Sequence, residues 1–172
     1  AANYFRSVKP DLKLTSFMAI PAFIGSAIGA KLASSFPTSV FRPLIIVLLI
    51  SVAIYTWRKP ELGISEKLKF SERRRHQIVV VLGFIIGFYD GIFGPGTGTF
   101  LVFLLVGLVG YAFLKASATA KFINIATNLG AIISFQLTGH IWWKLGLALA
   151  IANVCGAVIG SRLAIRGGSP LV

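Results

Sequence analysis

The sequence is poor in the residues that water-soluble proteins use to cover their surface. Only 13% of its 172 residues are charged, whereas soluble domains carry about 25%. A soluble globule of this length could not cover its surface with so few charges, so that class is excluded. Cys155 is the only cysteine, which excludes a scaffold held by intrachain disulfides.

Apolar residues and basic charge dominate what is present. Hydrophobic residues make up 56% of the chain and the mean hydropathy is +0.84, which also excludes a disordered chain. The sequence therefore predicts an integral membrane protein. It holds 17 Lys and Arg against 5 acids, a net charge of +12. In a membrane protein this excess marks cytoplasmic loops, so we expect the lipid bilayer as a partner and no nucleic acid.

Neither catalysis nor a bound cofactor is expected. His76 and His140 lie at the ends of apolar runs and lack the spacing of metal ligands. The string GPGTGT at 94–99 is not followed by the Lys-Ser/Thr pair of a phosphate-binding loop, and no hydrolase or dinucleotide motif occurs. We therefore predict no enzyme activity, no metal and no cofactor.

Long apolar runs predict an all-α fold, a polytopic bundle of transmembrane helices. A helix needs about 20 apolar residues to cross the hydrocarbon core of a membrane. Four runs qualify as spans, at 14–32, 41–57, 121–138 and 142–163. The basic polar stretch 58–76 is predicted to be a cytoplasmic loop.

The apolar segment 77–111 is interrupted by glycine and proline over 90–99. Each arm has about 13 residues and would be about 20 Å long, too short to cross the membrane alone. We therefore predict a broken helix or a re-entrant hairpin. A short connector bracketed by Lys115 and Lys121 is expected to follow it.

Two segments of the chain form an internal repeat. KLTSFMAIPAFIGSAIGAKLA (13–33) and KLGLALAIANVCGAVIGSRLA (144–164) align without gaps at an offset of 131, with 9 of 21 positions identical. Repeats are a common way to build transporters. The offset divides the chain into three predicted parts. Residues 1–57 are the C-terminal part of a first repeat, with two complete spans and the end of a truncated one. Residues 58–76 are the basic loop, and residues 77–172 are a second repeat that lacks its last helix. By the same arithmetic we expect a fragment of a larger protein, without roughly 55 residues before it and roughly 25 after it.

The basic residues predict how the two repeats are oriented. With the loop 58–76 inside, a segment 77–111 that crosses once would put the four basic residues after it outside. If it crosses twice or forms a re-entrant hairpin, all four lie inside, which agrees better with the positive-inside rule. Each repeat then has an odd number of crossings, so we expect the two copies to be inverted.

The glycines and threonines of the break predict an anion site. Thr97 and Thr99 are placed to cap the half-helix that follows, whose exposed N–H groups favour an anion. The alternative is that glycines serve only close helix packing, as we expect for the run at 83, 87 and 91. The substrate-binding residues expected in the break are Gly94, Gly96, Thr97, Gly98 and Thr99.

Polar residues near the break are candidates for the same site. Asp90 is the only acid in the apolar part, either as a coupling or gating group or as a helix cap. Lys121 is either the countercharge of an anionic substrate or a lysine that reaches the membrane interface. Asn124, Thr127 and Asn128 share one helix face, where they would bind oxyanion oxygens or hydrogen-bond a neighbouring helix.

Three segments resemble the sulfite exporter TauE/SafE family of membrane transporters. They read GFYDGIFGPGTGTF, KASATAKFINIATNLGAIISF and GAVIGSRLA, and the first two look like the bacterial inner-membrane subgroup of that family. The resemblance implies a multi-pass protein of the inner membrane that moves small sulfur-containing anions by proton-linked or facilitated transport. Many relatives have three glycines in the break, where this chain has Gly96-Thr97-Gly98.

We therefore expect a transporter of small anions, with sulfur-containing oxyanions or sulfonates as the substrate class. The alternative is a non-transporting membrane scaffold or assembly protein. A transporter predicts a polar cavity lined by residues 90–99 and by the 124/127/128 face, whereas a scaffold predicts a dry, packed break. A second copy of the chain, forming a homodimer, is a further expected partner.

Overall fold

The computed structural model describes residues 12–35, scattered positions between 37 and 54, and residues 68–167, with side chains described as far as residue 160. Within these ranges the chain is helical and contains no strand, which confirms the all-α prediction. It divides into two units, residues 1–138 and 139–172. The helices are α2 (Leu12–Ala33), α4 (Glu72–Ile92), α5 (Thr97–Leu104), the π-helix η1 (Leu105–Val109), α6 (Phe113–Leu137) and α7 (Trp143–Gly167).

Three of these helices are long and apolar enough to cross a membrane: α2, α4 and the 143–160 part of α7. On α2, large apolar side chains at four-residue spacing stay exposed, as expected for a ridge that faces lipid; they are Ile20, Ile24 and Ile28. These observations confirm a multi-pass membrane protein. The predicted span 41–57 lies largely outside the described residues.

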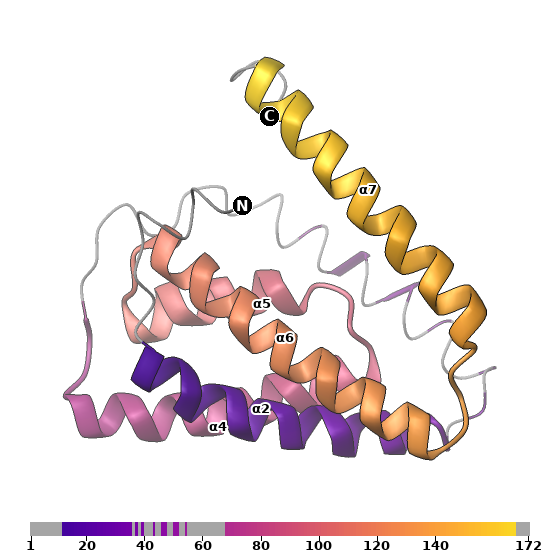
Figure 1. Ribbon diagram of the computed structural model, residues 1–172. Helices are drawn as coiled ribbons and strands as arrows, with labels where there is room; N and C mark the ends of the chain where they lie inside the picture. The colour runs from indigo at the N-terminus through magenta and orange to yellow at the C-terminus, as the bar shows by residue number, and fades with distance from the viewer. Residues whose placement is uncertain are drawn as a thin grey trace. The chain divides into compact units, whose positions relative to one another are not determined.

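Helices α2 and α4 pack with their backbones in close approach, and they run side by side in Figure 1. A Cβ added to Gly25 or Gly29 of α2 would lie less than 3 Å from a carbonyl oxygen of α4. The glycines at 83, 87 and 91 of α4 meet carbonyl oxygens of α2 in the same way. The packing role expected for this glycine run is therefore confirmed. In a membrane such close packing stabilises helix pairs, because lipid tails remove the hydrophobic driving force.

Helix α6 also packs against α2. A Cβ on Gly130 would lie 2.5 Å from the carbonyl oxygen of Phe23. The hydroxyl of Ser26, which is fully buried, donates a hydrogen bond of 2.6 Å to the carbonyl oxygen of Thr127. This bond fixes the register of α2 against α6.

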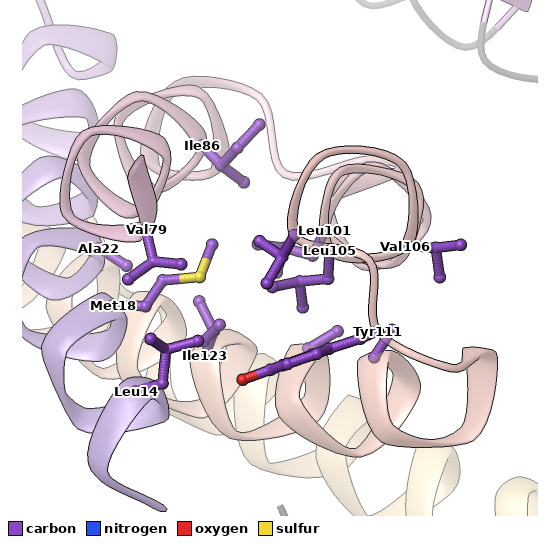
Figure 2. Packing of buried hydrophobic residues seen from close by; sticks show 13 residues of the cluster. Leu14, Met18, Ala22, Val79, Ile86, Leu101, Leu105, Val106, Tyr111 and Ile123 are labelled. Atoms are coloured by element: carbon purple, nitrogen blue, oxygen red, sulfur yellow. The ribbon is translucent and has the colours of Figure 1, made fainter. Parts of the chain in front are cut away.

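The core of residues 1–138 lies between α2, α4, α5, η1 and α6. Figure 2 shows Met18 of α2 and Ile123 of α6 pointing toward Leu101 and Leu105. Tyr111, only 2% exposed, closes the same cluster from the connector after η1. The core therefore attaches α5 and η1 to the α2–α4–α6 bundle.

Two sequence predictions about the broken segment need correction. The first arm has 21 residues, not about 13, because the polar residues from Glu72 onward already form the first turn of α4 and because Asp90 and Gly91 remain helical at its end. The second arm, Thr97–Val109, has the short length expected. Helix α4 is therefore long enough to cross the membrane by itself.

The predicted connector between Lys115 and Lys121 is helical, so that prediction was wrong. Both lysines lie in α6, which begins at Phe113. The intervening residues alternate alanine with Ser and Thr, and alanine is the strongest helix former. The actual connector is 110–112, where Gly110 has a φ of 87° that ends η1.

Helix α7 forms most of the second unit. Its described side chains, through residue 160, are all exposed. It begins at Trp143, 131 residues after the start of α2 at Leu12, which is the offset of the sequence repeat.

Candidate functional site

The break between α4 and α5 is four residues long, from Phe93 to Gly96. Gly94 and Gly96 have φ values of 79° and 83°, a left-handed backbone that side-chain-bearing residues rarely adopt. Pro95 between them has no N–H to continue a helix. The break is therefore shorter than the predicted 90–99, because only the glycines with positive φ end the helix.

Tyr89 of α4 holds the break from one side. Its hydroxyl donates a 2.7 Å hydrogen bond to the carbonyl oxygen of Pro95. Its ring contacts the rings of Phe93 and Phe100, with centroids 5.6 and 5.5 Å away. Sequence analysis missed Tyr89; the available signal was a tyrosine directly before the acid of the break.

Asp90 holds the break from the same helix end. The Thr97 hydroxyl lies 2.6 Å from Asp90 Oδ1 and 2.7 Å from the carbonyl oxygen of Gly94, so it can donate to either. The predicted capping by Thr97 and Thr99 is wrong: Gly96 occupies the cap position and no side chain caps α5. Asp90 thus contacts the hydroxyl of Thr97, the first residue of α5, whereas the helix cap considered for it would bind backbone N–H groups.

The first turn of α5 presents backbone N–H groups. Phe100 N–H bonds the carbonyl oxygen of Gly96 at 3.0 Å, the first regular bond of the helix. The N–H groups of Gly98 and Thr99, the two residues before Phe100, have no backbone acceptor among the described residues. Such groups carry the positive end of the helix dipole.

Asn124 of α6 lies beside this turn. A Cβ on Gly98 would be only 3.1 Å from Asn124 Nδ2, so glycine lets the amide approach the α5 backbone. Asn124 Oδ1 is buried and has no hydrogen-bond partner in the described part of the chain. The structure thus brings two of the predicted site residues, Gly98 and Asn124, together from different helices.

The other predicted residues of α6 lie apart from this pair. Thr127 is buried, its hydroxyl bonds the Asn124 carbonyl oxygen at 3.1 Å, and its own carbonyl faces Ser26 of α2. Asn128 is exposed and donates to the same Asn124 oxygen at 2.7 Å. Lys121 is also exposed, one turn before Asn124. Of the three predicted polar residues of this face, Asn124 is therefore the one whose side chain lies against Gly98 of α5.

Two hollows among the described residues differ from the predicted polar cavity in their lining. The hollow that borders α5 has a volume of about 180 Å³ and an apolar lining of Ile86, Phe100, Phe103 and Leu104. Another, of about 450 Å³, lies at the polar end of α2 and α4 and is lined by Lys13, Phe17, Glu72, Arg73 and His76. Among the described residues, Gly98 and Asn124 are thus in close contact, and neither of them lines these two hollows.

Comparisons with known proteins give relatives along the whole chain. It is 36% identical over 170 residues to a probable membrane transporter protein, ORF9, of a Sinorhizobium species, covering 99% of this chain and 64% of that protein. It is 32% identical over 177 residues to a probable membrane transporter protein of Haemophilus influenzae, covering 100% of this chain and 67% of the relative. For the probable membrane transporter protein YfcA of Escherichia coli K12 the identity is 34% over 164 residues, with 94% and 58% covered.

The chain thus spans about two thirds or less of the length of these curated relatives. No solved structure matches it. Residues 1–171 match the family described as sulfite exporter TauE/SafE. With a match over nearly every residue and multi-pass helices in the structure, the chain belongs to the sulfite exporter TauE/SafE family.

Proposed function

We propose that the full-length protein transports small sulfur-containing oxyanions or sulfonates across the bacterial inner membrane. The family description and the transporter names of the relatives support transport. The broken α4–α5 segment supports a site for an anionic substrate. Irregular backbone at membrane depth is tolerated only where protein or a water-filled cavity covers it, and a substrate cavity at the break would meet this requirement. Family membership alone does not give the class of sulfur-containing substrates or the bacterial inner membrane, which are proposed for this protein.

The observation that carries the proposal is the group of donors at the start of α5. The N–H groups of Gly98 and Thr99 have no backbone acceptor among the described residues, and Asn124 Nδ2 lies 3.1 Å from the place that a Cβ on Gly98 would take, which adds a third donor from another helix. Neutral donors at a helix N-terminus suit an oxyanion, whose oxygens accept several hydrogen bonds. We assign these three residues as substrate ligands, with Gly94, Gly96 and Thr97 shaping the backbone and Thr127 and Asn128 supporting Asn124.

Asp90 is the group that couples anion binding to protonation in this proposal. Its carboxylate is bonded to Thr97, at the start of the helix whose N–H groups would hold the anion. An ionised carboxylate repels an anion nearby, so protonation of Asp90 and anion binding favour each other. We therefore assign Asp90 to coupling and Lys121, exposed one turn from Asn124, to attracting the anion.

A membrane scaffold is the second candidate function. The apolar lining of the hollow beside α5 favours it, because a transport path needs a polar surface near the break. A scaffold would use the break only to connect α4 and α5. The two functions differ in whether solute reaches Gly98 and Asn124.

Transport by the full-length protein in proteoliposomes decides between them. We expect saturable uptake of radiolabelled sulfite that exceeds uptake by empty vesicles and that unlabelled sulfonates reduce. The control for purification and reconstitution is Gly107→Ala, because a Cβ added at Gly107 meets nothing within 4 Å. A folded protein that moves neither sulfite nor any sulfonate would overturn the proposed substrate class.

A further inference from the structure

The basic ends of α2 and α4 lie together. The Lys13 ammonium is 3.6 Å from a carboxylate oxygen of Glu72, the first residue of α4. Farther along, Gly91 of α4 meets Ser26 of α2, so the two helices run parallel. Both helices are long and apolar enough to cross a membrane. Their shared N-terminal end therefore lies at one surface of the bilayer.

Positive charge exceeds negative charge at this end. Among residues 12–35 and 68–76, Glu72 is the one acid. The cations at the starts of the two helices are Lys13, Lys69, Arg73, Arg74 and Arg75. Lys13 pairs with Glu72, whereas Arg73 is exposed and forms no ion pair in the described part of the chain. This end thus attracts anions, and the Arg73 guanidinium is available to bind one.

A hollow of about 450 Å³ lies between the two helices at this end. Its lining consists of Lys13 and Phe17 of α2 and of Glu72, Arg73 and His76 of α4. His76 is held in place by two contacts. Its Nδ1 donates a hydrogen bond of 2.7 Å to the carbonyl oxygen of Glu72, and its ring meets the Phe17 ring edge-on, with the centroids 4.8 Å apart. The hollow thus has a fixed wall and offers cationic donors from both helices.

An apolar face of α2 continues from the hollow. Phe17, Ile20 and Ile24 follow Lys13 at spacings of four, three and four residues, so the four side chains share one face. All three apolar side chains are exposed. A face that is charged at the membrane surface and apolar beneath it matches a phospholipid, whereas a free phosphate ion would use the hollow alone.

We infer that the hollow binds the phosphate group of an anionic phospholipid, with Arg73 and Lys13 as donors. A guanidinium can hold a phosphate through two parallel N–H···O bonds, and basic pockets between transmembrane helices bind lipid headgroups. The acyl chains lie along Phe17 and Ile20. The lipid stabilises the pairing of α2 with α4, because it contacts both helices. This inference does not depend on transport.

Lipid binding to the full-length protein in detergent micelles tests the inference. The probe is fluorescently labelled phosphatidylglycerol. We expect saturable binding that unlabelled phosphatidylglycerol competes away, whereas equal concentrations of phosphatidylcholine, which has no net charge, and of inorganic phosphate do not. Competition by phosphatidylcholine as strong as that by phosphatidylglycerol would overturn the anionic headgroup. Equally strong competition by inorganic phosphate would overturn the lipid as the ligand.

Two neighbouring arginines distinguish a site from diffuse attraction. Arg73→Gln removes the guanidinium that lines the hollow, and we expect about a tenfold lower affinity for phosphatidylglycerol. The matched control is Arg74→Gln, which removes the same charge one residue along. The Arg74 guanidinium lies 5.1 Å from the centroid of the Phe70 ring and outside the lining of the hollow, so we expect about the wild-type affinity. An equal loss in the two variants would overturn the site.

Lys13→Gln is a second variant, on the other helix. It removes the α2 cation of the hollow and leaves the Glu72 carboxylate unpaired, so we expect a lower affinity for phosphatidylglycerol here too. Lys13 and Arg73 are both exposed, so both variants should keep the wild-type melting temperature in the absence of lipid. Wild-type affinity in Lys13→Gln and Arg73→Gln would overturn the inference.

Discussion

The hydroxyl of Thr97 lies 2.6 Å from a carboxylate oxygen of Asp90, so this side-chain contact joins the end of α4 to the start of α5 across the break. This contact fixes the helix that presents the N–H groups of Gly98 and Thr99. It also ties the charge of Asp90 to the geometry of the proposed anion site.

Replacing Thr97 with valine should loosen the break. The change removes the hydroxyl and keeps the shape, and a hydrogen bond to a charged group contributes about 1–3 kcal/mol. We expect a lower free energy of unfolding and weaker sulfite uptake by the full-length protein, measured by denaturation in micelles and by flux. Thr97→Ser keeps the hydroxyl and should retain most of the free energy of unfolding and most of the sulfite uptake. An equal loss in the two variants would show that the Thr97–Asp90 contact contributes to neither.

A negative charge at Asn124 should abolish anion transport. Asn124→Asp removes the Nδ2 donor beside Gly98 and puts a carboxylate there, so substrate is repelled. Gln136→Glu also replaces an amide by a carboxylate on α6, about three turns away at an exposed position. We expect at least a tenfold loss of sulfite uptake in the first variant and about the wild-type rate in the second. Equal rates in both would remove Asn124 from the site.

Gly87 should not tolerate even a methyl group. A Cβ there would overlap the backbone of Ala22, which cannot move away as a side chain can. Gly87→Ala should therefore lower the free energy of unfolding by about 1–3 kcal/mol. Gly107→Ala, with open space around the added atom, is the matched comparison. A Gly87→Ala protein as stable as wild type would mean that α2 and α4 are farther apart in the membrane.

Neutralising Asp90 should strengthen anion binding. Asp90→Asn keeps an acceptor for Thr97 and removes the charge that repels the substrate. Methanesulfonate is a suitable probe, because it is a sulfonate monoanion. We expect it to bind more tightly to Asp90→Asn than to wild type at the same pH. Equal affinity for the two proteins would mean that the charge of Asp90 does not act on the anion.

Helix positions were the part of the fold that the sequence could predict. Long apolar runs predicted α2, α6 and α7, and the Gly-Pro-Gly string predicted an interruption after α4. The ends of the break could not be predicted, because composition does not show which glycines have positive φ. Gly91 stays helical against Ser26, while Gly94 and Gly96 turn the chain.

The candidate site was predictable by residue type but not by geometry. Polar residues of α6 were expected near the break, yet only the structure shows that Asn124 meets Gly98 while Thr127 turns toward α2. Helical spacing places residues on a face, but the packing partner decides which of them is used. Tyr89 was missed because its bond to the Pro95 carbonyl depends on the path of the break.

The most direct test of the anion site is nuclear magnetic resonance of the labelled full-length protein, with sulfite added. We predict saturable shifts of the Gly98 and Thr99 amide signals and of the Asn124 side-chain amide, at sulfite concentrations where the Gly107 amide signal stays unchanged. Shifts spread evenly over all glycine amides, or none at Gly98 and Thr99 under conditions where the protein transports sulfite, would contradict the site.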